Sequence, residues 1–146
     1  MPNTQVDLPD INVWLALTDP DHAHHQRARY YWEQESVSNI AFCRITMLGL
    51  LRLATNRKVM HGQPFTPEEI WQAYRAYRAL PEITFVQESW DVEKQMAKWS
   101  DIPDFSVTRW TDCYLAAAAL TGGYRLVSFD RDFFAFGGLD FLHLIP

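Results

Sequence analysis

The sequence has few of the features by which many protein classes are first recognised. No apolar run approaches the ~20 residues that span a bilayer, and no basic segment near the N-terminus leads into an apolar one. Two cysteines occur, Cys43 and Cys113, and their spacing fits neither a disulfide framework nor a zinc site. These features predict a cytoplasmic protein whose two thiols are small buried hydrophobic groups.

Positive charge is also scarce. The 146 residues include 13 lysines and arginines against 18 acidic residues, and the net charge of −5 disfavours a simple nucleic-acid-binding surface. Ten of the basic residues are arginines, whose guanidinium forks match phosphate oxygens but which also commonly cover the ends of apolar segments. Five arginines flank acidic positions in the sequence: Arg44, Arg52, Arg109, Arg125 and Arg131.

Several catalytic motifs are missing as well. The sequence contains no GxSxG elbow, no Gly-rich phosphate loop and no HExxH motif. Three histidines gather at His22, His24 and His25, but they begin a polar segment just after a turn, which is typical of a solvated helix end. The carboxylates are therefore the strongest candidates for chemistry.

The residues that are present suffice for one folded domain over residues 1–146. Hydrophobic residues make up 48% and aromatic residues 14%, which excludes a disordered chain. Strands are predicted over residues 5–8, 38–42, 83–87, 125–129 and 141–144. Helices are predicted over residues 11–17, 22–35, 45–54, 67–80, 90–99 and 109–120. This alternation indicates an α/β fold, a three-layer α/β/α sandwich with a mostly parallel central sheet.

Three aspartates are expected at one edge of this sheet. Asp10 follows the first strand, Asp130 follows the fourth strand, and Asp112 lies in the first turn of a helix. In a parallel sheet the carboxyl ends of strands and the amino ends of the following helices share one edge. Clustered carboxylates repel each other, and burial adds to the cost of ionising them. A divalent cation would relieve both costs, so this edge is predicted to be a metal-dependent catalytic site.

Each aspartate also has a simpler structural explanation. Asp10 can cap a helix, Asp112 can favour the positive end of its helix dipole, and Asp130 can form a turn. Separate caps, however, need not converge on one edge. Asp112 also shares a helix face with Leu115 and Ala119, so its carboxylate is expected to point inward and to need a partner.

Two nearby polar residues are secondary candidates. Asn12 lies two residues after Asp10 and can either donate an amide hydrogen bond to a carboxylate or merely fill the first turn of a helix. Asp132 lies two residues after Asp130 and is a fourth acidic candidate, although capping of the following FFAF segment is the favoured interpretation.

Several blocks of the sequence, in this order, resemble a known family: LPDINVWLAL, the HxxH of His22 and His25, CRITMLGLLRLATN, WTDCYLAAAA and LVSFDRDF. The chain resembles PIN-domain ribonucleases over nearly its whole length, and among them the VapC toxins of bacterial VapBC toxin–antitoxin pairs. The resemblance implies an α/β/α sandwich with Mg²⁺- or Mn²⁺-dependent endonuclease activity on RNA. It also implies a homodimer, and inhibition by a cognate VapB antitoxin whose C-terminal tail occupies the active-site groove.

The resemblance assigns the catalytic and metal-binding roles to Asp10, Asp112 and Asp130, and it matches Thr46 to a polar position that braces the acids. The sequence departs from the family at Met47, where such nucleases commonly have a glutamate. A thioether does not suit Mg²⁺, which prefers hard oxygen ligands. No glutamate lies within residues 36–67 to replace it.

These residues suggest a mechanism. Asp10, Asp112 and Asp130 are expected to hold one Mg²⁺, with Asp130 also suited to orient the attacking water. Arg44 and Arg109 are expected to anchor the RNA backbone through forked hydrogen bonds.

Two other functions stay open. Because Met47 replaces an acid, the chain can be a PIN fold that mainly binds a partner. A metal-dependent phosphatase would also use acids at strand ends, but it needs a nearby lysine. The three lysines, Lys58, Lys94 and Lys98, are not placed beside a strand end in the sequence.

Overall fold

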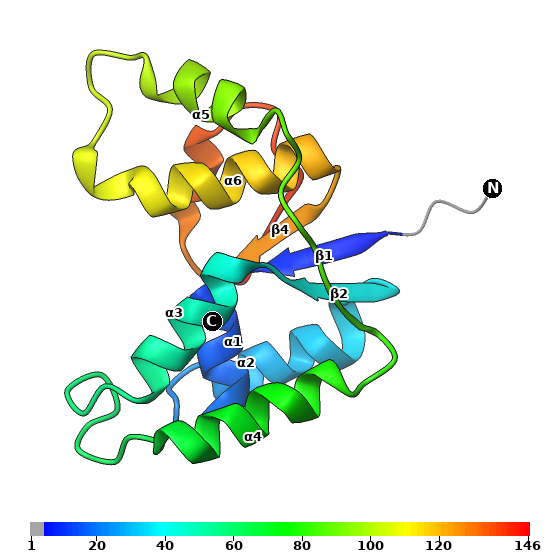
Figure 1. Ribbon diagram of the computed structural model, residues 1–146, viewed down its shortest axis with the longest axis vertical. Coiled ribbons are helices and arrows are strands. Elements are labelled where there is room, and N and C mark those ends of the chain that lie inside the picture. The colour runs from blue at the N-terminus through cyan, green and yellow to red at the C-terminus, as the bar shows by residue number, and fades with distance from the viewer. Residues whose placement is uncertain (1–4) are drawn as a thin grey trace.

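The computed structural model describes residues 5–146, and at its centre lies a five-stranded sheet (Figure 1). All neighbouring strands are parallel, and their order is β3-β2-β1-β4-β5. The strands are β1 (Val6–Pro9), β2 (Asn39–Phe42), β3 (Ile83–Phe85), β4 (Arg125–Ser128) and β5 (Phe141–His143). The predicted parallel sheet is confirmed, and every predicted strand is present.

Helices connect these strands as α1 (Ile11–Thr18), α2 (His25–Tyr30), α3 (Arg44–Ala54), α4 (Pro67–Arg78), α5 (Val92–Ser100) and α6 (Trp110–Gly122). Short helical segments lie at Tyr31–Glu35 (η1), Val107–Arg109 (η2) and Arg131–Ala135 (η3). Within residues 5–146, no helix is long and apolar enough to cross a membrane.

The single helix predicted over residues 22–35 is wrong in detail. Turns occupy its first residues, and the regular helix begins at His25. Its second half widens into a π-helical turn, in which the Ser36 N–H donates to the Tyr31 carbonyl at 2.8 Å. This wider turn contains Tyr31, a fully buried residue whose hydroxyl reaches the sheet.

Helices cover both faces of the sheet, which confirms the three-layer sandwich. Helices α1 to α4 lie on one side and α5 and α6 on the other (Figure 1). Strand side chains alternate between the two sides. Leu8 and Leu126 pack in the cluster under α6, whereas Phe42 packs with Trp14 of α1, with ring centroids 3.7 Å apart.

A glycine sets how closely α1 and α3 approach each other. A Cβ atom added to Gly49 of α3 would lie 2.2 Å from Cδ1 and 2.6 Å from Cγ1 of Ile11, the first residue of α1. This close approach fixes the first turn of α1, and with it the end of β1 that carries Asp10.

The amino edge of the sheet contains a buried ion pair that sequence analysis missed. Asp7 of β1 is fully buried and accepts hydrogen bonds from Nε and Nη2 of Arg125 at 2.8 and 2.9 Å and from the Tyr31 hydroxyl at 2.6 Å. Arg125 begins β4, so it lies at the opposite edge from Asp10. Although Arg125 lies close to Asp130 in the sequence, it is therefore not among the arginines around the acidic site.

Candidate active site

Three aspartates lie at the carboxyl edge of the sheet, on two neighbouring strands and one helix. Asp10 follows β1, Asp130 follows β4, and Asp112 lies in the first turn of α6. The N–H of Asp10 donates to the Val127 carbonyl at 2.8 Å, which extends the pairing of β1 with β4 up to the site. The register of these two strands thus determines how Asp10 and Asp130 face each other.

Asp10 is both a helix cap and the most deeply buried of these acids. Its Oδ1 accepts from the Ile11 N–H at 2.7 Å and its Oδ2 accepts from the Ser128 hydroxyl at 2.8 Å. Burial is the main reason why its pKa is raised from 3.8 to about 6, and the carboxylates of Asp112 and Asp130 add to the effect. The two hydrogen bonds oppose this shift without cancelling it. A nearby cation would favour the ionised form.

Ser128 connects the segments of the site. Its hydroxyl is fully buried, donates to Asp10, and accepts from Nδ2 of Asn12 at 3.2 Å and from the N–H of Asp130 at 3.0 Å. Of the two interpretations left open for Asn12, a hydrogen bond to a carboxylate or a filler of the first helical turn, neither is the one observed, because its amide donates to Ser128, which in turn donates to Asp10. The sequence signal for Ser128 was weak, because a serine at the end of a strand has no pattern of its own.

Asp130 caps the short helix η3, since its Oδ1 accepts from the Asp132 N–H at 2.8 Å. The favoured interpretation of Asp132 as the cap is therefore wrong. The carboxylate of Asp132 instead lies 3.7 Å from Nη1 of Arg109 and is largely exposed. Among the described residues, none donates a hydrogen bond to Oδ2 of Asp130, so this oxygen can take a new partner.

Arg109 brings a cation into the acidic cluster. Its Nε lies 3.4 Å from Oδ2 of Asp112, which is close enough for an ion pair but not aligned as a hydrogen bond. Nε and Nη2 are buried and have no hydrogen-bond partner within residues 5–146. Burial raises the pKa of Asp112, Asp130 and Asp132 raise it further, and Arg109 lowers it. Arg109 therefore has donor capacity for an anion at this edge.

Arg44 and Thr46 lie in the first turn of α3. The Arg44 guanidinium lies 4.6 Å from the ring centroid of Phe85 and forms no ion pair with any described residue. The buried Thr46 hydroxyl accepts from the Cys43 N–H at 3.0 Å and donates to the Cys43 carbonyl at 3.1 Å. Thr46 thus stabilises the start of α3, and none of its hydrogen bonds to described residues reaches the acids it was expected to brace.

Met47 belongs to the hydrophobic core. Its side chain is 6% exposed and lies in the cluster that contains Trp14, Phe42 and Leu50. The position where an acid was expected therefore contributes packing between α3 and its neighbours.

The acidic edge fits a divalent cation in donor type and charge. Its donors are hard carboxylate oxygens, which Mg²⁺ prefers, and their mutual repulsion falls when a cation binds. Within residues 5–146, no three carboxylate, imidazole or thiol groups lie close enough to hold one metal ion. Protein-bound Mg²⁺ usually keeps several waters and uses one or two carboxylates together with substrate phosphates. Such a partial set of protein ligands is compatible with this edge.

Comparison with known proteins agrees with this arrangement. Residues 8–139 match the PIN domain family. The chain is 38% identical over 143 residues to Ribonuclease VapC41 of Mycobacterium tuberculosis, an alignment that covers 91% of this chain and 94% of that relative.

Solved structures share the fold. VapC20 of Mycobacterium tuberculosis, described as a sarcin-ricin loop cleaving toxin, superposes with a TM-score of 0.68 at 20% identity and covers 92% of this chain and 97% of its own. A chain of a toxin–antitoxin complex from Klebsiella pneumoniae gives a TM-score of 0.63 at 16% identity, covering 96% and 98%. By family match and sequence identity, the chain belongs to the PIN-domain family, among the VapC ribonuclease toxins.

Proposed function

We propose that this chain is a metal-dependent endoribonuclease, the toxin of a type II toxin–antitoxin pair. The observation that carries the proposal is the meeting of Asp10, Asp112 and Asp130 at one sheet edge, where Asp112 and Asp130 add to the raised pKa of Asp10 and Asp130 adds to that of Asp112. The 38% identity to a ribonuclease supports RNA as the substrate class. Such a site would cut phosphodiester bonds of RNA by hydrolysis.

One or two of the three aspartates would hold Mg²⁺, with Mn²⁺ as a substitute and with water and a substrate phosphate as the other ligands. When bound, the ion lowers the pKa of a coordinated water and neutralises charge that develops on the phosphate. The Ser128 hydroxyl keeps Asp10 oriented through its 2.8 Å hydrogen bond. Asp130 has an oxygen without a donor among the described residues, so it is suited to accept a proton from the attacking water and orient it.

Arginines would position the RNA backbone. Arg109 has two N–H-bearing nitrogens without a hydrogen-bond partner among residues 5–146. Both are closed off from solvent, so the side chain would have to turn outward to donate to a phosphate oxygen. Arg44 lies on the same sheet edge, beyond β1, at the start of α3. Together they would offset the repulsion between an acidic protein and a polyanion.

The toxin assignment includes partners. A cognate VapB-type antitoxin would inhibit the enzyme, and two copies of the chain would form a homodimer in the cytoplasm. The similarity to a chain from a toxin–antitoxin complex supports an antitoxin partner through the shared fold.

A weakened PIN-fold binding module is the second candidate. The observation that favours it is Met47, which lies in the core where an acidic ligand was expected. Calorimetric titration with Mn²⁺ separates the two functions. Saturable uptake that is lost in Asp10→Asn contradicts the binding module, and no uptake by the wild-type chain contradicts the nuclease.

Cleavage of a structured RNA in Mg²⁺ tests the proposed function. We expect Asp10→Asn and Asp112→Asn to slow cleavage by on the order of a hundredfold or more, because each removes negative charge that would hold the metal ion against the reacting phosphate. The exposed Asp21→Asn has the same change of charge away from this edge and should cleave at the wild-type rate. Undiminished cutting by the Asp10 or Asp112 variant would eliminate the proposed roles.

A further inference from the structure

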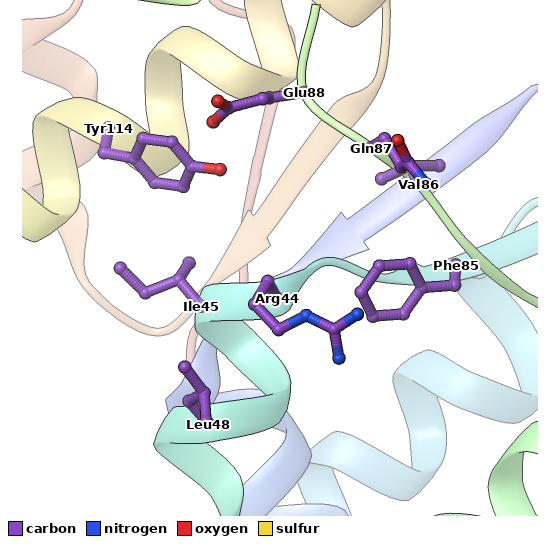
Figure 2. A pocket seen from close by; sticks show the side chains of 8 residues that line it. All are labelled: Arg44, Ile45, Leu48, Phe85, Val86, Gln87, Glu88 and Tyr114. Carbon is purple, nitrogen blue, oxygen red and sulfur yellow. The ribbon is translucent and has the colours of Figure 1, made fainter.

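A pocket of about 500 Å³ lies on the carboxyl side of the sheet, at the ends of β2 and β3 (Figure 2). Its walls come from the first turns of α3, from the segment that follows β3, and from α6. Its volume is in the range of pockets that bind small organic groups, about 300–1,000 Å³.

The pocket and the acids are neighbours in the fold. The pocket lies at the carboxyl ends of β2 and β3, and the acids lie at the ends of β1 and β4, the next two strands of the sheet. Helix α6 contributes to both, through Asp112 at the acidic site and Tyr114 in the pocket wall. The two side chains leave α6 on different faces, so an RNA strand would have to follow the sheet edge past the ends of β2 and β1 to reach both places.

One side of the pocket is flat and apolar with a cation beside it. The half-buried Phe85 ring has two guanidinium neighbours, Arg44 at 4.6 Å and Arg78 at 5.0 Å from its centroid. Leu48, which is 53% exposed, adds apolar surface. Unpaired RNA bases stack on aromatic rings and on guanidinium planes. Because Arg44 has no ion-pair partner within residues 5–146, it is also free to pair with a phosphate.

The opposite side presents polar groups. Figure 2 shows the Tyr114 hydroxyl pointing toward the Glu88 carboxylate, with Gln87 beside it along the chain. Burial and the Glu88 carboxylate raise the pKa of Tyr114, so its hydroxyl stays protonated. Glu88 is exposed and forms no ion pair with a described residue. Its carboxylate can therefore accept hydrogen bonds from a ligand in the pocket.

We propose that this pocket binds an unpaired guanine base of the RNA near the cleaved phosphate, with Glu88 reading its Watson–Crick edge. This inference deepens the proposed function and rests on it. Guanine presents a ring N–H and an amino group side by side, and a carboxylate accepts from both. Adenine and cytosine place an acceptor nitrogen beside their amino group, and uracil flanks its N–H with two carbonyls, so each of them would face the carboxylate with a lone pair.

Amide NMR spectra of the chelator-treated protein, titrated with the four nucleoside 5′-monophosphates, test this assignment. We expect shifts at residues 44–48, 85–88 and 114, and an affinity for the guanine nucleotide about tenfold above the other three. Glu88→Gln should remove that preference. Glu93→Gln, an equal change of charge at an exposed position of α5, should keep it.

Two arginine variants separate phosphate binding from base reading. Arg44→Ala should weaken all four nucleotides to a similar extent, whereas Arg52→Ala, an exposed position on the same helix, should leave binding unchanged. Equal affinity for the four nucleotides, or a guanine preference that survives in Glu88→Gln, overturns the proposal. A third outcome also overturns it: nucleotides shift none of the amide resonances of the pocket residues, and Leu48→Arg converts dimers to monomers. The pocket would then be a protein–protein surface.

Failure of this inference is distinguishable from failure of the proposed function. Binding is measured with chelator present, so it needs neither metal nor cleavage. Mg²⁺-dependent cutting without any guanine preference rejects the pocket assignment alone. Guanine binding at the pocket without Mg²⁺-dependent cutting rejects the nuclease alone.

Discussion

Single side chains hold the acidic edge in its arrangement, and the sequence predicts the roles of some of them but not of others. Asp10, Asp112 and Asp130 were recognisable because each directly follows a strand or begins a helix. Ser128 and Asp7 were not, because their roles depend on strand register. Pairing of Pro9 with Val127 brings the Ser128 hydroxyl to Asp10, and pairing of Asp7 with Arg125 forms the buried ion pair. No local pattern encodes such a register.

The buried Asp10 carboxylate should make the metal-free protein less stable at neutral pH. Its pKa rises from 3.8 to about 6 on folding, so the folded state binds the proton more tightly than the unfolded state does. Stability therefore falls as pH rises from about 4 to about 6, and the full cost, about 3 kcal/mol, applies above that range.

Asp10→Asn should remove this cost. We expect the chelator-treated variant to be about 1–3 kcal/mol more stable than wild type in urea unfolding at pH 7, with the difference shrinking toward pH 4. Asp21→Asn is the matched control. A variant that is less stable at both pH values would show that the hydrogen bonds of Asp10 outweigh its burial. A stabilised variant would also show that lost cleavage does not reflect unfolding.

The elements themselves were largely predictable. Hydrophobic patterns and turn residues located the strands, and the capping box of Thr66 and Glu69 marked the start of α4. The division of residues 22–35 was not predictable, because the π-helical turn contains Tyr31, which reaches Asp7 from a distant part of the chain. Likewise, Thr46 pairs with its own helix start. Helical periodicity does not show which tertiary contact a side chain finds.

The contact between α1 and α3 predicts that Gly49→Ala is destabilising. The new methyl group would overlap Ile11, and overpacking of this kind costs about 1–3 kcal/mol. Alanine's helix preference recovers up to about 1 kcal/mol, so we expect a net loss of about 1–2 kcal/mol in urea unfolding. Cleavage should slow as well, because Ile11 follows Asp10.

Gly137→Ala is the matched control, since an added Cβ meets no atom within 4 Å there. Its free energy of unfolding should stay within about 0.5 kcal/mol of wild type. If Gly49→Ala proves equally neutral, Ile11 changes rotamer freely and does not determine the spacing of the two helices.

At the scale of the whole molecule, the residues that stabilise the fold and the residues proposed for catalysis lie at opposite edges of the sheet. Its amino edge contains Asp7 with an arginine partner, whereas its carboxyl edge concentrates acids that lack sufficient positive charge. The three-layer arrangement followed from the alternation of helices and strands in the sequence. Which side chains meet at each edge could not be predicted in the same way, because it depends on the pairing of strands that are distant in the sequence.

Asp7→Asn should therefore reduce stability and leave the chemistry intact. The substitution leaves the Arg125 guanidinium, which is a quarter exposed, without its carboxylate partner, and we expect a loss of about 2–3 kcal/mol in urea unfolding. The exposed pair of Arg29 and Glu33 gives the control, because Glu33→Gln should cost no more than about 1 kcal/mol. Well below its unfolding temperature, Asp7→Asn should cleave RNA at the wild-type rate. A slower rate in the fully folded variant would contradict the separation of the two edges.

Helix α6 carries Asp112 and Tyr114 two residues apart, with their side chains about 200° apart around the helix axis. A nuclease built on this helix would hold the pocket and the acidic site at a fixed separation. The number of nucleotides between the recognised guanine and the broken bond would be the same in every RNA it accepts, whatever the surrounding sequence. Mapping cleavage ends across unrelated transcripts would reveal that constant offset.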